Sequence, residues 1–383
     1  MKKSLFTVLS LLLGYAFLEV LCASIMMVIE KNPYPRLTLP VKFHLSAAQK
    51  AGIVQLMADT HGLYSSELGW RPRPTPNNPD GIRNAVSVGI ESRKKRRIAT
   101  FGDSFTWGDE VGDTETWEHQ LENDLPNSEV LNFGMSMYGT DQAFLRYRLQ
   151  GAKYHPDIVL IGLQPENTCR NVNVFRPFYI HGDIPPMAKP RFVFESGALR
   201  LLPNPFAKVQ DYQALLDKEQ TTLQMLGRND YYYDCYKWNN RWEKTPFLRL
   251  LAHLSYTIRG KRIKQAIVTR KQFDPSSDAF QLTIKITDSF YREVRANKGR
   301  PVILLIPTIS QVELFLKTRN CHYQGFRDEF KNRGFSTIDL MDVLVSAAGT
   351  NPTWKKDFFR EGGHYSPRAN KLIADFIASK LTA

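Results

Sequence analysis

Cysteine is scarce in this chain, with four in 383 residues, and no two of them form a C-x-x-C pair. That spacing excludes a zinc knuckle and a thioredoxin-like redox motif. A scaffold stapled by disulfides is excluded too, because Cys169, Cys235 and Cys321 outside the apolar N-terminal stretch allow one bridge at most. We therefore expect neither a bound metal nor a cofactor.

Acidic residues are outnumbered, with 38 Asp and Glu against 51 Lys and Arg, which gives a formal net charge of +13. Such an excess attracts nucleic acid, anionic headgroups or acidic polymers, or it serves solubility alone. No zinc-finger or RNA-binding signature accompanies the charge, so we expect no nucleic-acid partner. The hydrophobic fraction of 43% and the aromatic fraction of 12% exclude a disordered chain.

Charged residues are also rare near the N-terminus. Lys2 and Lys3 precede an apolar run over residues 5–29, broken mainly by Tyr15 and Glu19. About 20 apolar residues cross a bilayer as a helix. Residues 1–30 therefore predict an uncleaved signal anchor with the rest of the chain outside the cytoplasm, and a cleaved signal peptide with secretion is the alternative. Because Glu19 is costly in lipid, we expect it to pair with another helix or to be protonated.

Residues 31–95 read as an extended, proline-rich region, with one short helix expected over 46–58. From residue 96 to 383 the pattern alternates between strands and helices. Apolar strands are expected at 98–101, 130–133, 158–163, 302–306 and 336–340, and helices at 114–125, 141–149 and 367–381. This order predicts an α/β domain with a doubly wound, parallel five-stranded sheet between two layers of helices.

About 140 residues separate the third and fourth expected strands, which is too many for one crossover connection. We interpret residues 170–298 as a large insertion packed over the edge of the sheet. Its first part is rich in proline, tyrosine and tryptophan, and residues 245–298 look largely helical.

Ser104 directly follows the first expected strand, in the run Phe-Gly-Asp-Ser-Phe at 101–105. Ligands of parallel α/β sheets collect at the carboxyl ends of the strands, so a nucleophile belongs at this turn. Alone, Gly-Asp-Ser is equally typical of an Asx turn that caps a helix.

Three further residues stand at matching places. Gly134 ends the second strand, Asn167 follows the third, and His364 precedes the last helix. The N–H groups of Ser104 and Gly134 and the side-chain amide of Asn167 can stabilise an oxyanion. His364 can take the serine proton, and it needs a carboxylate to hold its tautomer. Glu361, three residues before the histidine, is the expected partner.

These four blocks resemble the SGNH (GDSL-type) hydrolase family, and the match runs in order from about Arg97 to the C-terminus, apart from the insertion. The resemblance implies a three-layer α/β/α fold, Ser104 as nucleophile and His364 as general base. It also implies an oxyanion hole of Ser104, Gly134 and Asn167. The run Glu-Leu-Gly-Trp-Arg at 67–71 is similar to members linked to bacterial polysaccharide modification.

Two positions depart from the family pattern. Thr168 stands where an aspartate usually follows the block III asparagine, and Glu361 stands where an aspartate usually precedes the histidine by three. Asp357 is a second candidate for orienting His364, and some members of the family manage with a backbone carbonyl.

The sequence thus predicts a membrane-anchored serine esterase that acts on an acyl or acetyl ester of a small molecule or a glycan. An O-acyltransferase that passes the acetyl group to a polysaccharide is the close alternative. A non-catalytic binding or assembly protein that retains the fold is the alternative from another class.

Overall fold

The computed structural model describes residues 2–31, 43–85, 87–92, 94–180, 185–236, 245–269 and 271–382. Its centre is a five-stranded sheet in the order β11-β10-β5-β3-β4, with every neighbouring pair parallel. The strands are β3 (Arg96–Phe101), β4 (Ser128–Asn132), β5 (Ile158–Leu163), β10 (Arg300–Leu305) and β11 (Thr337–Asp339). The predicted fold class is confirmed, and each strand lies within two residues of the expected range.

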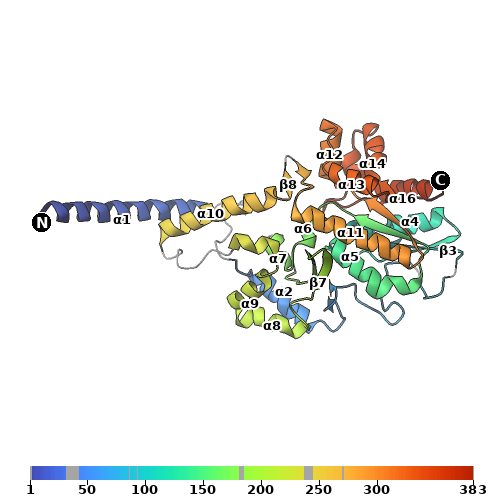
Figure 1. Ribbon diagram of the computed structural model, residues 1–383, viewed down its shortest axis with the longest axis horizontal. Coiled ribbons are helices and arrows are strands. Elements are labelled where there is room, and N and C mark those ends of the chain that lie inside the picture. Colours follow the sequence, from blue (N-terminus) through green and yellow to red (C-terminus); the bar gives the residue numbers. More distant parts are fainter. Residues whose placement is uncertain are drawn as a thin grey trace.

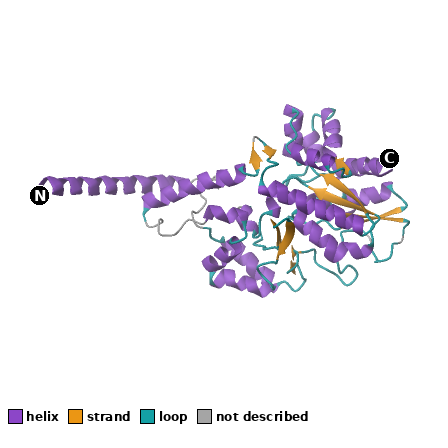
Figure 2. Cartoon of the chain, viewed as in Figure 1, coloured by secondary structure: helices purple, strands orange, loops and turns teal. Residues whose placement is uncertain are grey.

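Helices cover both faces of this sheet, as Figures 1 and 2 show. Helices α4, α14 and α16 pack together on one face, and α5 and α11 pack together on the other. The helices around the sheet are α4 (Trp117–Asp124), α5 (Thr140–Arg146), α11 (Asp278–Ala296), α12 (Ile309–Thr318), α13 (Gln324–Asn332), α14 (Leu340–Gly349), α15 (Trp354–Phe358) and α16 (Pro367–Thr382). Because both faces are covered, every residue of β5 is buried, as its unbroken apolar run requires.

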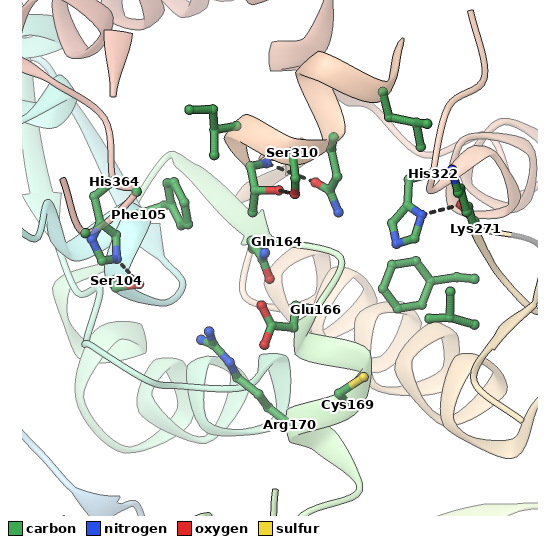
Figure 3. A pocket seen from close by; sticks show the side chains of 18 residues that line it. Ser104, Phe105, Gln164, Glu166, Cys169, Arg170, Lys271, Ser310, His322 and His364 are labelled. Atoms are coloured by element: carbon green, nitrogen blue, oxygen red, sulfur yellow. Dashed lines mark hydrogen bonds between the residues drawn. The ribbon is translucent and has the colours of Figure 1, made fainter. Parts of the chain in front are cut away.

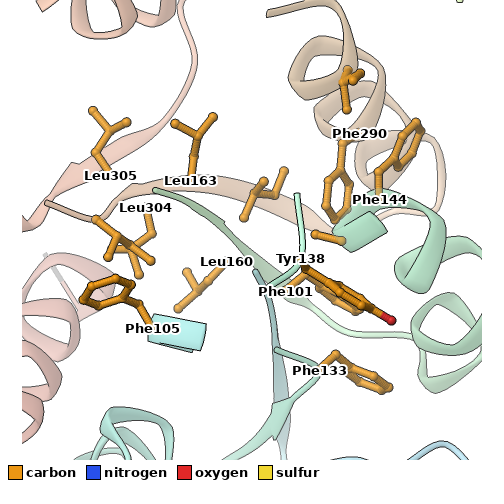
Figure 4. Close-up of a cluster of buried hydrophobic side chains, with 14 of the residues drawn as sticks. Phe101, Phe105, Phe133, Tyr138, Phe144, Leu160, Leu163, Phe290, Leu304 and Leu305 are labelled. Carbon is orange, nitrogen blue, oxygen red and sulfur yellow. The ribbon is translucent and has the colours of Figure 1, made fainter. Parts of the chain in front are cut away.

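Aromatic rings fill the space between the sheet and the α5–α11 layer (Figure 4). Phe101 from β3 stacks on Phe133 with ring centroids 4.8 Å apart, and Phe290 of α11 meets Phe101 edge-on. Gly151 makes room for this cluster, because a Cβ atom there would lie 2.2 Å from the Phe101 ring. This packing holds the end of β3 in place, immediately before the chain reaches Ser104.

The segment before the sheet is less extended than the sequence predicts. The short expected helix is present as α2 (Ala47–Ala58), which begins with a capping box between Ser46 and Gln49. The strand pair β1 (Tyr64–Ser65) and β2 (Gly69–Trp70) follows, and Trp70 is buried in the main core. Residues 32–42, which include the first prolines of this region, lie outside the described part.

The long stretch between β5 and β10 contains the crossover helix α11 as well as an inserted region. Its other elements are α6 (Asn167–Asn171), α7 (Arg176–Tyr179), β6 (Arg191–Glu195), β7 (Ala198–Leu202), α8 (Gln213–Asp217), α9 (Glu219–Gly227), α10 (Pro246–Gln265), β8 (Val268–Thr269) and β9 (Gln272–Phe273). The aromatic-rich part packs into the same hydrophobic core as the sheet, with Phe175, Phe178 and Tyr212 fully buried.

The order of the strands predicts where a crevice lies at the edge of the sheet. The chain leaves β3 toward β4 on one side and later returns to β5 on the other side of β3. At such a switch of direction the loops after the two strands part, and a crevice opens at their carboxyl ends. The loops after β3 and β5 are those that carry Ser104 and Asn167.

Candidate active site

Ser104 is the first residue of a short helix, α3 (Ser104–Trp107), that begins directly after β3. The Asp103 carboxylate caps it by accepting the Phe105 N–H at 3.0 Å. Gly108, in the left-handed region with φ of 84°, ends it after one turn. The Asx-type cap and the nucleophile position are therefore one structure: the cap starts α3 at Ser104, which is 6% exposed at the edge of the cleft.

Close packing beneath α3 explains the glycine before Asp103. A Cβ atom on Gly102 would lie 2.2 Å from Thr106 Oγ1, and one on Gly162 of β5 would lie 2.6 Å from the same atom. Thr106 is fully buried between these two backbones. The glycines let α3 lie directly on the sheet, which fixes the height of Ser104 above the strand ends.

His364 lies beside Ser104, with its Nε2 atom 2.9 Å from the serine Oγ. The two residues are 260 positions apart in the chain. A tight turn carries the imidazole: Arg360 N–H donates to the His364 carbonyl at 2.8 Å, and Gly363 has φ of 91°. The Phe105 ring packs on the imidazole with centroids 5.0 Å apart. The structure thus brings together the two residues that the sequence assigned to nucleophile and base.

Glu110 is the carboxylate that is hydrogen-bonded to the imidazole, while Asp109 Oδ2 lies 3.9 Å from His364 Nε2. The Glu110 Oε2 atom lies 2.7 Å from His364 Nδ1 and also accepts the His364 backbone N–H at 3.2 Å. Its Oε1 atom accepts the Gly362 N–H at 2.9 Å. Partial burial raises the pKa of Glu110, but the hydrogen bonds from Gly362 and His364 lower it by more. The pKa of Glu110 therefore lies below its usual value. Glu110 is therefore held as a carboxylate at neutral pH.

The backbone at Glu110 is unusual for this residue type, since its φ of 68° lies in the left-handed region. A non-glycine residue there costs about 1–2 kcal/mol, which the hydrogen bonds to the histidine turn must offset. Strained backbone conformations cluster at functional sites, where the surrounding structure holds them in place. The six-residue step from Ser104 to Glu110 is thus shaped to return the carboxylate to the histidine.

The structure places neither Glu361, the expected orienting carboxylate, nor the alternative Asp357 against the imidazole. Glu361 is exposed, and among the described residues it makes no hydrogen bond to His364. Asp357 faces another way: it accepts from Asn351 Nδ2 at 2.8 Å and from Arg368 at 2.9 Å, and these bonds lower its pKa. The turn from 360 to 363 brings Gly362 and His364 toward the loop after α3, and this direction leaves Glu361 on the solvent side.

The Gly134 N–H, which the sequence assigned to the oxyanion hole, is hydrogen-bonded inside the protein. It donates to Asn132 Oδ1 at 2.8 Å, in the interior of the molecule. A Cβ atom at this position would lie 2.3 Å from Trp107 N and 2.6 Å from Thr106 C. Glycine is therefore required here because the backbone of α3 passes directly over it.

The side-chain amide of Asn167, the third predicted oxyanion donor, lies against two acceptors inside the protein. Its amide nitrogen, assigned from the acceptors around it, lies 3.1 Å from Asp103 Oδ2 and 3.3 Å from the Tyr138 carbonyl. Both N–H groups are thus taken by acceptors beneath Ser104 rather than turned to the crevice. The residue supports the cap of α3 from below, and this leaves only the Ser104 N–H of the three predicted donors.

Arg170 is the nearby cation that sequence reasoning missed. Its Nη1 atom donates to Tyr138 O at 3.0 Å and lies 3.3 Å from Asp103 Oδ2. Burial alone lowers the pKa of Arg170, but Asp103 and Glu166 raise it more, so the guanidinium is charged. Its Nε is buried and has no partner among the described residues. The spacing Asn-x-x-Arg on α6 after β5 was the available signal.

A cleft of about 870 Å³ opens at Ser104 and extends along the carboxyl edge of the sheet. Figure 3 shows His364 and Ser104 at one end, Gln164, Glu166 and Arg170 along the floor, and His322 with Lys271 at the other end. The Gln164 side chain is 1% exposed, and its Oε1 has no partner in the described part. The floor therefore combines the Arg170 cation with the Glu166 carboxylate, and the rest of the lining includes apolar side chains such as Phe105 and Phe273. No cluster of metal-ligating side chains occurs in the described residues.

No family model matches this chain, and no curated protein does. Solved structures that match include a member of the lipolytic protein G-D-S-L family from Veillonella parvula (12% identity, 75% of this chain and 98% of that one, TM-score 0.38). The acetyl xylan esterase AlAXEase matches at 10% identity over 74% of this chain and 99% of that one, with a TM-score of 0.40. The lipase/acylhydrolase from Enterococcus faecalis matches at 13% identity over 75% and 95%, with a TM-score of 0.36. These solved structures are of the type that the motifs predicted, and a likeness at this level carries no argument about substrate.

Proposed function

We propose that this chain is an ester hydrolase in which Ser104 is the nucleophile, His364 the general base and Glu110 the carboxylate that orients it. The observation that carries the proposal is the continuous chain of hydrogen bonds from Ser104 Oγ through both imidazole nitrogens to Glu110. It stands at the carboxyl ends of the strands, beside an open cleft. This is the geometry by which a serine hydroxyl becomes nucleophilic.

In the first half of the reaction Ser104 Oγ forms a bond to the ester carbonyl carbon while its proton passes to His364 Nε2. The carbonyl π electrons move to oxygen and give a tetrahedral oxyanion. When the carbonyl re-forms, the bond to the leaving alcohol breaks and His364 Nε2 returns the proton to that alcohol. Glu110 stabilises the imidazolium between these two transfers. In the second half, water takes the place of the alcohol and the acid is released.

The oxyanion requires donors, and we infer that the Ser104 N–H and Arg170 supply them. An N–H at the start of a helix has no partner within that helix. Arg170 lines the same cleft and points toward Ser104 in Figure 3. A single donor of this kind typically accounts for about 2.7–4 kcal/mol of barrier lowering. A guanidinium also favours substrates that carry a negative charge next to the ester.

An O-acyltransferase is the second candidate, and the length of the cleft favours it. The cleft continues from Ser104 to His322 and Lys271, well beyond the space that a small acyl group fills. A sugar hydroxyl bound there can replace water in the second half of the reaction. The membrane anchor belongs to the proposal as well: the helix Leu5–Val28 is long and apolar enough to span a bilayer.

The decisive test is labelling of the full-length protein in detergent with a fluorophosphonate, together with hydrolysis of p-nitrophenyl acetate. We expect labelling of the wild type and none of Ser104→Ala, with a loss of activity of about 10⁴-fold or more. Addition of a glycan acceptor then distinguishes the two candidates, since a transferase yields acetylated glycan. A folded wild type that takes no label supports the non-catalytic alternative, and label that survives in Ser104→Ala refutes the assignment of the nucleophile.

A further inference from the structure

Helix α10 of the inserted region packs along helix α1 (Lys2–Lys31), and the pair extends away from the body of the molecule (Figure 1). Both helices run toward the body in the same direction. The Phe247 N–H, in the first turn of α10, donates to Glu19 Oε2 of α1 at 2.9 Å. Glu19 therefore caps α10 across 228 residues of sequence, which answers the expectation that it pairs with another helix.

The surfaces in contact are built from small or flexible side chains. Cys22 and Met26 of α1 are 3% and 9% exposed, and they follow Glu19 on one face of the helix. Ala252 of α10 is 1% exposed. Small residues at a helix–helix contact are typical of packing within lipid, where close approach of the backbones replaces the hydrophobic driving force.

The position of Glu19 sets the depth of α10. Glu19 lies nine residues before Val28, where the apolar span of α1 ends, which corresponds to about 14 Å along the helix. The first nine residues of α10, Pro-Phe-Leu-Arg-Leu-Leu-Ala-His-Leu, therefore lie beside the apolar span. Arg249 is the one cation in that stretch, and it is not without a partner.

One side of α10 carries exposed apolar side chains, and Ala252 is buried on another side. Leu251, Leu254 and Ile258 follow one face of the helix and are 41%, 49% and 54% exposed. Beyond them the sequence becomes basic, with four Lys and Arg within 259–264. The first half of α10 is thus apolar and lies level with the membrane span, and its second half is basic. This order matches that of acyl chains and anionic headgroups in a bilayer leaflet.

Helix α10 also leads directly into the wall of the cleft. The strand pair β8 and β9 follows it after two residues, and Val268, Lys271 and Phe273 line the cleft beyond Ser104. In Figure 1, β8 lies where the two-helix arm meets the body. Whatever holds α10 in place therefore also fixes the position of this end of the cleft.

We propose that α10 is a second membrane-embedded helix, inserted beside α1 in the bilayer leaflet nearest the body. It holds the far end of the cleft at the headgroup surface, so that the ester is taken from the membrane. The lipid contact stands independently of the reaction, and the origin of the substrate rests on the proposed function.

Photo-crosslinking of the full-length protein tests the lipid contact. The protein is reconstituted in vesicles of phosphatidylethanolamine and phosphatidylglycerol, with p-benzoylphenylalanine in place of Leu254 or Ile258. We expect phospholipid adducts by mass spectrometry. Val54 on α2 and Leu149 after α5, which are 54% and 48% exposed, are the matched control positions and should give none. Adducts between two copies of the chain, or no adduct, overturn the proposal.

A paired activity measurement tests the origin of the substrate. In the same vesicles, Leu254→Asp with Ile258→Asp should leave hydrolysis of p-nitrophenyl acetate within about twofold of wild type. Release of acetate from an O-acetylated alkyl glycoside embedded in the vesicles should fall about tenfold, because the charges disfavour insertion. An equal rate on the embedded ester overturns this part. Absence of p-nitrophenyl acetate hydrolysis in the wild type instead refutes the proposed function, and the lipid adducts remain a separate result.

Discussion

The body of the molecule and the two-helix arm of α1 and α10 differ in where their apolar side chains lie. In the body, β5 is fully buried between helices and β3 is buried after its first residue, and Glu166 and Arg170 line one cleft with Ser104. In the arm, Leu5, Phe17 and Val28 of α1 are 71%, 72% and 71% exposed, and Glu19 turns toward the neighbouring helix. Apolar side chains are therefore packed inside the body, whereas on α1 they face outward along a helix that is long and apolar enough to span a membrane.

The largest effect is expected from a substitution of Glu110, whose proposed role concerns the body and leaves the arm unchanged. Glu110→Gln should lower kcat for p-nitrophenyl acetate by about 10²–10⁴-fold, because a neutral side chain no longer stabilises the imidazolium. Glu361→Gln and Asp357→Asn are the matched controls and should stay within about twofold of wild type. A large loss in Glu361→Gln with none in Glu110→Gln would restore the assignment from sequence.

Much of the site could be predicted, because position along the chain determines it. Ser104 and His364 each stand beside a strand end or a helix start, and the topology of a doubly wound sheet brings these positions together. Glu110 was missed because its carboxylate returns to the histidine through a left-handed backbone, which spacing does not show. Gly134 and Asn167 were identified by their positions after strands. The direction in which their N–H groups point depends on the packing around Asn132 and Asp103, which the sequence does not show.

The arm was only half predictable. The length and apolarity of α1 are visible in the sequence, and so is the cost of Glu19 in lipid. The partner of Glu19 was not visible, because Phe247 lies 228 residues away and backbone N–H groups leave no mark in sequence.

Packing in the body gives the next largest effect. Gly134→Ala should lower the free energy of unfolding by about 1–3 kcal/mol, since its Cβ would collide with the backbone of α3. Gly349→Ala is the control, because nothing lies within 4 Å of a Cβ atom there. Urea denaturation of both variants, with activity followed in parallel, makes the measurement. Equal midpoints for the two would show that α3 tolerates the methyl group.

A pH series sharpens the contrast within the body. The pKa of Glu110 is lower in the folded protein than in the unfolded chain, so its contribution to stability is present above about pH 4.3. That contribution is lost as the pH falls through the folded value. Glu110→Gln should therefore melt about 2 °C below wild type at pH 7, and the difference should shrink below about pH 4. A difference that widens in acid contradicts the direction of this shift.

The smallest expected effect lies in the arm. Glu19→Leu removes the acceptor at the start of α10, and the loss of a helix cap typically costs about 1 kcal/mol. Amide hydrogen exchange in the first turn of α10 should become about fivefold faster, with p-nitrophenyl acetate hydrolysis unchanged. Ser24→Leu on the exposed side of α1 serves as the control and should leave exchange unaffected. Unchanged exchange in Glu19→Leu would mean that α10 is held without this bond.

The chain separation between the three members of the site has a consequence in time. Ser104 and Glu110 are made within six residues of each other, whereas His364 follows 254 residues after Glu110. At a synthesis rate of roughly 5–20 residues per second, the serine waits about 10 to 50 s for its base. During that interval a nascent chain already carries the apolar helix α1, Ser104 and Glu110. On the proposed mechanism such a chain does not attack esters until the histidine turn has been synthesised.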